Sequence, residues 1–115
     1  MAEIWHNPRC SKSRAALALL EAHYAPEALE IVAYLETPPG RARLEAVAGA
    51  LPGGARDLLR AKDAPSDLAD TGDAAILDAL EATPALIERP VVITSKGTII
   101  ARPPERVAEV LEEEN

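Results

Sequence analysis

Residues 2–34 read AEIWHNPRCSKSRAALALLEAHYAPEALEIVAY and predict a β-strand, an α-helix and a second β-strand. The apolar run 2–6 ends at the turn-forming pair Asn7-Pro8. Residues 11–24 repeat apolar side chains at helical spacing, and residues 29–34 are again mostly apolar. Two strands and a helix within so short a length predict a parallel βαβ unit with a right-handed crossover. The buried face of the helix would hold Leu17, Leu20 and Tyr24.

A helical insert is expected next, because no good strand is found between residues 37 and 88. One helix would follow Thr37-Pro38-Pro39 and end at Pro52-Gly53-Gly54. A short helix is predicted over 55–62 and a third over 73–82, with Asp73 as its cap. The side chains expected to point inward are Leu44, Val47, Leu51, Ile76, Leu77 and Leu80.

The C-terminal part predicts a β-hairpin and a last helix. Apolar runs at 90–95 and 98–101 flank the turn Lys96-Gly97, and they imply strands buried on both faces. Pro103-Pro104 would begin a helix that places Val107, Val110 and Leu111 on one face. The acidic end Glu112-Glu113-Glu114 is expected to be a frayed, solvated helix end. The whole order predicts an α/β fold with a mixed four-stranded sheet flanked by helices.

The composition describes a small acidic chain of 115 residues, with 12 Lys plus Arg against 19 Asp plus Glu and a net charge of −7. One domain over residues 1–115 is expected. The negative charge disfavours binding to nucleic acid and to anionic membranes, and no apolar run is long enough to span a bilayer. The N-terminal residues lack the pattern of a signal peptide, so we expect a cytoplasmic monomer.

The single cysteine, Cys10, is predicted to lie where the first strand gives way to the first helix. There its thiol would face unpaired backbone N–H groups and the positive end of the helix dipole, with Arg9, Lys12, Arg14 and His6 nearby. All of these favour the thiolate. A lone cysteine is more often a small buried hydrophobic residue, but no apolar residue lies within three positions of Cys10. The polar surroundings therefore favour a reactive thiol.

Several other uses of cysteine are excluded. A single thiol allows neither an internal disulfide nor a Cys-x-x-Cys cycle, since Ser13 takes the second position. The phosphatase loop would need an arginine where Ala16 stands. The only histidines, His6 and His23, are not at a metal-ligand spacing, so no metal is expected. A cysteine with a serine three residues on is compatible with one-thiol chemistry that takes its electrons from external thiols.

The residues around Cys10 resemble the active-site loop of the glutaredoxin-coupled arsenate reductase family. The resemblance continues in order over nearly the whole chain and implies a thioredoxin-like fold. The segments that carry it are HNPRCSKSR (6–14), YLETPP (34–39), LLR (58–60), IERPVV (87–92) and the stretch from Gly97 to Arg102-Pro103-Pro104.

The resemblance implies that Cys10 is the nucleophile and that Arg60, Arg89 and Arg102 bind the oxyanion. Guanidinium groups suit this task because they fork onto adjacent oxygens and neutralise the charge that keeps an oxyanion away from a thiolate. His6 would help to stabilise the Cys10 thiolate, and Ser13 would donate to the sulfur. The fold also implies a cis bond before Pro90, which would swing the preceding arginine toward the thiol.

The activity implied is the reduction of arsenate to arsenite, and the ligand of the site would be arsenate or a similar oxyanion. Glutathione would be a co-substrate and glutaredoxin a partner, and no bound cofactor is expected. Two alternatives stay open: a redox-responsive module that binds RNA polymerase, and a thiol oxidoreductase with another substrate. Taken singly, each arginine could also be structural: Arg60 a solvated helix residue, Arg89 a cover for the strand start, and Arg102 a charge beside the last helix. Arg106 is expected to be a simple helix-face residue.

Overall fold

The computed structural model describes residues 1–113, which divide into two compact units. The first unit is formed by residues 1–34 and 89–113, and the second by Leu35–Glu88. The first therefore combines the predicted βαβ unit with the predicted hairpin and last helix. The second corresponds to the predicted helical insert.

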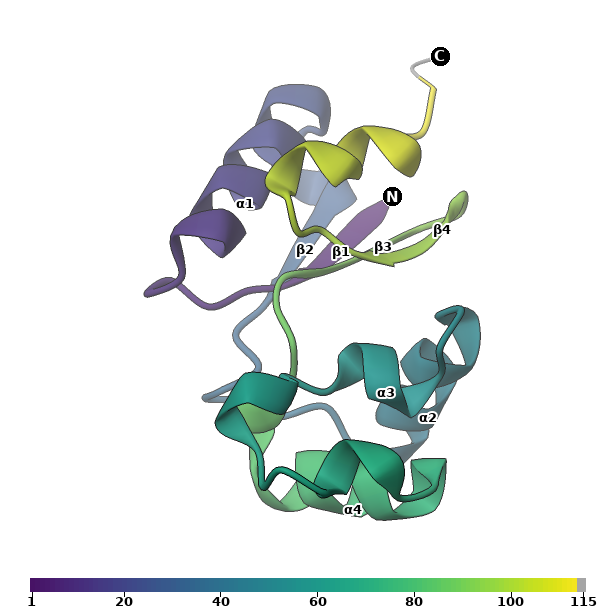
Figure 1. The fold of residues 1–115 in the computed structure, drawn as a ribbon. Coiled ribbons are helices and arrows are strands. Elements are labelled where there is room, and N and C mark those ends of the chain that lie inside the picture. Colours follow the sequence, from purple (N-terminus) through teal and green to yellow (C-terminus); the bar gives the residue numbers. More distant parts are fainter. Residues whose placement is uncertain (114–115) are drawn as a thin grey trace. The chain divides into compact units, whose positions relative to one another are not determined.

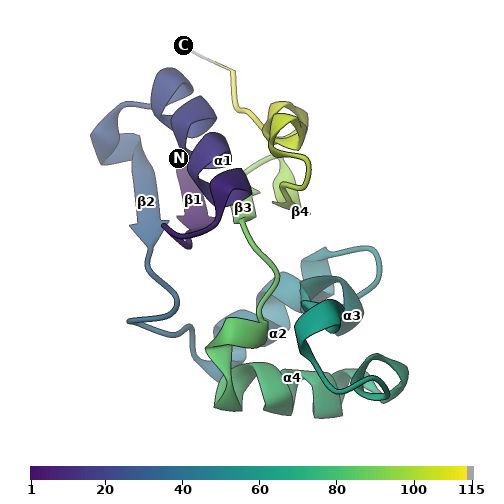
Figure 2. The ribbon, with the colours of Figure 1, turned by 60° about the vertical axis from the view of Figure 1, so that its left-hand side comes forward.

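A four-stranded mixed sheet forms the centre of the first unit. Its strands are β1 (Ala2–Trp5), β2 (Leu29–Val32), β3 (Val91–Thr94) and β4 (Gly97–Ile100). They lie side by side in the order β2-β1-β3-β4, as Figure 2 shows. Strand β1 runs parallel to β2 and antiparallel to β3, which in turn is antiparallel to β4. The predicted mixed sheet is thus confirmed.

Helix α1 (Ser11–His23) and the 3-10 helix η5 (Pro104–Glu109) pack on one another over the same face of this sheet (Figure 1). Ala2, Ile4 and Val92 from the sheet meet Leu20 from α1 and Val107 from η5 in a continuous core. The last helix is expected from the sequence, but its 3-10 form is not. The tighter 3-10 turn is common in short helical pieces.

The expectation of a frayed acidic end is wrong at Glu112, whereas Glu114 lies outside the described residues. The Glu112 carboxylate accepts hydrogen bonds from the Met1 ammonium group and from Ser95, and these lower its pKa to about 2. Its backbone N–H donates to Tyr24 Oη at 2.9 Å, and its carbonyl accepts from His23 Nε2 at 2.6 Å. Glu112 thus fastens the segment after η5 to the end of α1 and to the hairpin turn.

The second unit is built from α2 (Arg41–Ala50), α3 (Ala55–Leu58) and α4 (Asp73–Ala82), which pack on one another. The residues expected to point inward in α2 and α4, and Leu51 just after α2, are buried. The predicted helix 55–62 is too long: α3 ends at Leu58 because Leu59 pairs with Ile87 in an isolated β-bridge. That bridge draws the chain out of the helix. Gly72, rather than the predicted Asp73, occupies the N-cap of α4.

Candidate active site

Cys10 is the N-cap residue of α1, as the sequence predicts. Its backbone N–H donates to Asn7 O at 3.0 Å, and its carbonyl accepts the first helical hydrogen bond, from Arg14 N, at 3.0 Å. In this position the half-buried sulfur lies at the start of the helix, where the backbone N–H groups of Ser13 and Lys12 lower the pKa of the thiol. The start of the helix therefore favours a negatively charged sulfur.

A guanidinium group from the far end of the chain completes the surroundings of the sulfur. Arg102, which follows β4 closely, places Nη1 3.7 Å from Cys10 Sγ. The same nitrogen donates to the backbone carbonyl of Arg89 at 3.0 Å. That second contact holds the Arg102 side chain in place. The guanidinium is therefore kept beside the thiol by the backbone at the entry to β3.

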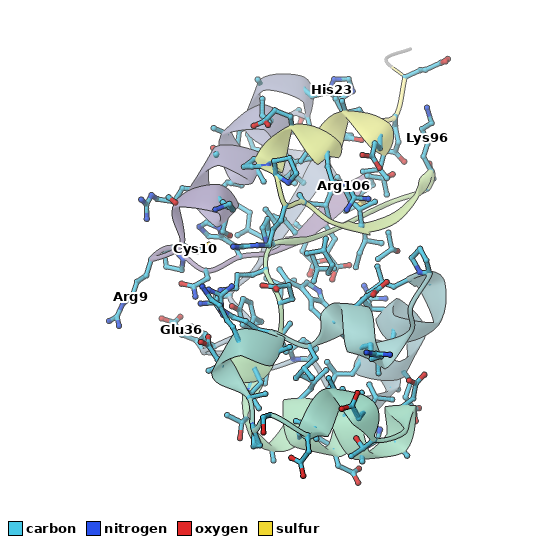
Figure 3. All side chains as sticks on the ribbon, viewed as in Figure 1. Arg9, Cys10, His23, Glu36, Lys96 and Arg106 are labelled. Atoms are coloured by element: carbon cyan, nitrogen blue, oxygen red, sulfur yellow. The ribbon has the colours of Figure 1, made fainter. Side chains whose placement is uncertain are left out.

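These contacts decide the charge state of the thiol. Burial alone raises the pKa of Cys10, but the N–H groups of Ser13 and Lys12 and the Arg102 guanidinium together lower it below its ordinary value of 9.0. The sequence reasoning assigned part of this effect to the neighbouring cations. Figure 3 shows instead that the Arg9 side chain extends away from the ribbon. Arg14 donates to Pro8 O at 2.8 Å, which closes the loop before the helix.

We expect the rate of alkylation of Cys10 by iodoacetamide to rise at lower pH in the folded protein than in the urea-unfolded chain. Only the thiolate is alkylated, and a lowered pKa populates it at lower pH. The chain has one cysteine, so the pH–rate curve reports this residue alone. A folded-state midpoint at or above that of the unfolded chain would contradict the assignment of Lys12, Ser13 and Arg102 as its stabilising donors.

His6 and Ser13 contact each other beside the loop, and the roles expected of them at the thiol stay predictions. His6 Nδ1 lies 2.7 Å from Ser13 Oγ, and the Asn7 N–H donates to the same oxygen at 3.0 Å. Burial lowers the pKa of His6, an effect that Glu21 opposes and Arg14 assists. A neutral imidazole is therefore favoured at neutral pH. The Ser13 hydroxyl therefore bridges His6 to the backbone of the loop at Asn7.

Asn7 is the residue of this loop whose role the sequence analysis missed. Its side chain is buried, with Oδ1 accepting the Arg9 N–H at 2.9 Å and Nδ2 donating to Tyr34 Oη at 3.4 Å. With its two backbone contacts to Ser13 and Cys10, Asn7 ties the loop to the start of α1 and to the end of the βαβ unit. The signal was present in the sequence, since asparagine side chains close turns by bonding to the backbone two residues on.

Replacing Asn7 by Ala should cost about 1–3 kcal/mol of stability, because it removes a buried donor and acceptor whose partners stay buried. It should also move the alkylation midpoint of Cys10 to higher pH, since the loop no longer holds Cys10 at the helix start. Tyr34→Phe, which removes one partner of Asn7, should give a smaller change of the same sign. Urea unfolding and alkylation measure the two effects, and an Asn7→Ala protein with both unchanged would exclude this role.

Pro90 and Arg89 lie at the entry to β3. The Arg89–Pro90 peptide bond is cis, as expected, and the Arg102–Pro103 bond is cis as well, which the sequence analysis did not predict. Pro90 is buried and Arg89 half-buried. The contact of Arg89 with the site runs through its backbone carbonyl, which accepts from Arg102. The oxyanion-binding role expected for its side chain stays a prediction.

Arg60 belongs to the second unit and is not the solvated helix residue that its sequence position allows. It follows α3 and is buried, with Nε 2.7 Å from an Asp63 oxygen and Nη1 2.9 Å from a Glu88 oxygen. Burial lowers the pKa of Arg60, but the two carboxylates outweigh that effect and raise it. Its guanidinium is thus held in a fixed orientation within its own unit.

Arg106 also differs from expectation, because it is not a simple helix-face residue. It is half-buried, with Nη1 donating to Ile100 O at 3.1 Å and Nε donating to Glu109 at 3.0 Å. Arg106 therefore ties η5 to the end of β4.

Residues 1–113 offer neither a metal site nor a membrane span. No group of three His, Cys, Asp or Glu side chains is placed to hold a metal ion. No helix in this part of the chain is long and apolar enough to cross a membrane.

A mixed sheet with a cysteine at the start of α1, in surroundings that favour its thiolate, is typical of one class of thiol-dependent proteins. Comparison with known proteins identifies the family. The model of the ArsC family matches residues 5–110, and this chain belongs to that family. An arsenate reductase of Neisseria meningitidis is 41% identical over 115 residues, covering 95% of this chain and 97% of the relative. The uncharacterized protein YfgD of Escherichia coli is 40% identical, with 95% of each chain covered.

Solved structures agree with the family assignment. The structure of an arsenate reductase from Vibrio cholerae superposes with a TM-score of 0.82 at 35% identity, covering 96% of this chain and 97% of that one. The fold is thioredoxin-like, as the resemblance in sequence implies.

Proposed function

We propose that this protein is an oxidoreductase that reduces arsenate to arsenite through Cys10, with glutathione and glutaredoxin as the source of electrons. The observation that carries the proposal is the contact of Cys10 Sγ with Arg102 Nη1 at the N-terminus of α1. A lowered thiol pKa supplies the nucleophile, and a guanidinium beside it can neutralise an approaching oxyanion. Relatives named arsenate reductases support the choice of arsenate.

The first step is the attack of the Cys10 thiolate on arsenic(V). A sulfur–arsenic bond forms, an arsenic–oxygen bond breaks, and the oxygen leaves as water after taking up protons. Arg102 can hold the negative charge that shifts from sulfur to the oxyanion during this exchange. Arg89 and Arg60 are proposed as further oxyanion ligands, and for these two the support is the family resemblance.

The remaining steps transfer two electrons to arsenic. The glutathione thiol displaces a second oxygen as water, so that arsenic carries two sulfur ligands. A glutaredoxin thiolate then attacks the glutathione sulfur and forms a mixed disulfide. The electron pair of the broken sulfur–arsenic bond stays on arsenic, which becomes arsenic(III). Hydrolysis of the bond to Cys10 releases arsenite and regenerates the thiol. A single cysteine suffices for this cycle, because the disulfide forms on the partner molecules.

An arsenite-release assay with each component omitted in turn tests the electron source. We expect release to require the protein, glutathione and glutaredoxin together. Full activity with a dithiol protein such as thioredoxin, in the absence of glutathione, would refute the proposed coupling. An oxyanion other than arsenate that is turned over far faster would refute the proposed substrate.

A further inference from the structure

The two edges of the sheet differ in whether their backbone groups are occupied. At the β4 edge, the Ile100 carbonyl accepts hydrogen bonds from Arg106 Nη1 at 3.1 Å and from the Arg102 N–H at 2.9 Å. At the other edge β2 is the outermost strand of the sheet, and no described strand pairs with its outer side. An unblocked edge strand is a template for a further strand.

Ile31 is the centre of this open edge. The next residue, Val32, turns its carbonyl toward β1, where it accepts the His6 N–H at 2.9 Å. Successive residues of a strand point their backbone groups to opposite sides, so those of Ile31 face outward. Its side chain lies on the α1 side of the sheet, because Ile31 pairs with the core residue Ile4. It is nevertheless 47% exposed.

A cavity of about 160 Å³ lies beside this strand and is lined by Glu21, Tyr24, Pro26, Leu29 and Ile31. Sites for small molecules usually enclose about 300–1,000 Å³. The smaller volume suits one side chain of an added strand.

The charged side chains of the segment that contains β2 are of one sign, and the positively charged Met1 ammonium group near this strand is already paired with Glu112. The sequence has no Lys or Arg between Arg14 and Arg41, and Glu21, Glu27 and Glu30 flank or form the edge. On the face away from α1, Glu30 lies directly beside Glu3 in the parallel pair. Adjacent carboxylates repel each other, and a cation brought in by a partner would relieve that repulsion. A second copy of this chain, with its net charge of −7, would increase it.

We propose that the outer edge of β2 binds an extended segment of a partner protein in which apolar and basic residues alternate. Its backbone pairs with Ile31, its apolar side chains cover Leu29 and Ile31, and its basic side chains meet Glu30 on the opposite face. This mode of recognition takes its affinity from main-chain hydrogen bonds and its selectivity from alternate side chains. The site does not involve Cys10, so it stands or falls independently of the proposed reductase activity.

The test is a titration of the ¹⁵N-labelled protein with a short synthetic peptide in which lysine and valine alternate. We expect the largest changes in amide chemical shift at Leu29–Ala33, and we expect binding to weaken as salt is added. A matched peptide of alternating glutamate and valine should leave these amides unchanged. Shifts centred elsewhere, or no shifts at β2, would overturn the proposal, as would self-association of the protein through β2.

Two variants and a matched control locate the contact. Ile31→Asp should weaken binding of the basic peptide by about tenfold or more, since a buried apolar contact becomes a buried charge. Leu19→Asp makes the same change at a side chain on α1 of similar exposure, 43%, and should have no effect. Glu30→Lys, which leaves the apolar surface intact, should weaken the basic peptide and favour the acidic one. Equal effects of Ile31→Asp and Leu19→Asp would overturn the proposal.

Discussion

Replacing Cys10 by Ser should abolish arsenite release while leaving the protein folded. The serine hydroxyl is not ionised at neutral pH and forms no stable bond to arsenic, so the first step is lost. The fold should persist because Cys10 is an N-cap with a half-buried side chain, and serine is among the preferred N-cap residues. We expect thermal unfolding at an unchanged or slightly higher temperature, with no detectable turnover.

Ser11→Ala is the matched control, since Ser11 is the exposed neighbour of Cys10 in the first turn of α1. It should retain activity. Arsenite release by a folded Cys10→Ser protein would show that the thiol is not the nucleophile. Equal loss of activity in both variants would assign the effect to damage of the helix start.

The sequence predicts the architecture of the first unit because its elements are short and strongly patterned. The apolar runs define β1, β3 and β4, and the helical spacing of Leu17 and Leu20 defines α1. The position of Cys10 at the helix start follows from the polar residues that separate these two elements. All of this is local information, and the structure confirms it.

Local sequence patterns do not predict contacts between distant residues, and only the family resemblance placed Arg102 at the Cys10 site. Arg102 meets Cys10 across 92 positions, and Asn7 meets Tyr34 across 27. Neither pair has a local pattern, since only the order of the strands brings the end of β4 beside the start of α1. The same holds for Leu59, which leaves the predicted helix to pair with Ile87. The local sequence indicates which side chains could bind or react, and the fold determines which of them come into contact.

Replacing Arg102 by Ala should raise the pKa of Cys10 and lower the rate of arsenate reduction by about ten- to a hundredfold. The substitution removes the positive donor to the sulfur, and a charge-assisted hydrogen bond contributes roughly 1.5–3 kcal/mol. The iodoacetamide midpoint and the arsenite-release rate measure the two effects on the same protein. Arg60→Ala and Arg89→Ala should lower the rate through weaker oxyanion binding.

Arg102→Lys separates charge from geometry. An ammonium group near the sulfur should restore part of the thiol pKa shift, whereas the loss of the planar fork should leave oxyanion turnover impaired. Arg106→Ala is the matched control, because this second arginine beyond β4 bonds to Ile100 O and Glu109. It should cost about 1 kcal/mol of stability and leave the thiol pKa unchanged. If Arg106→Ala raised the alkylation midpoint as much as Arg102→Ala, the effect would come from loosening the end of β4, and the direct role of Arg102 at the sulfur would be wrong.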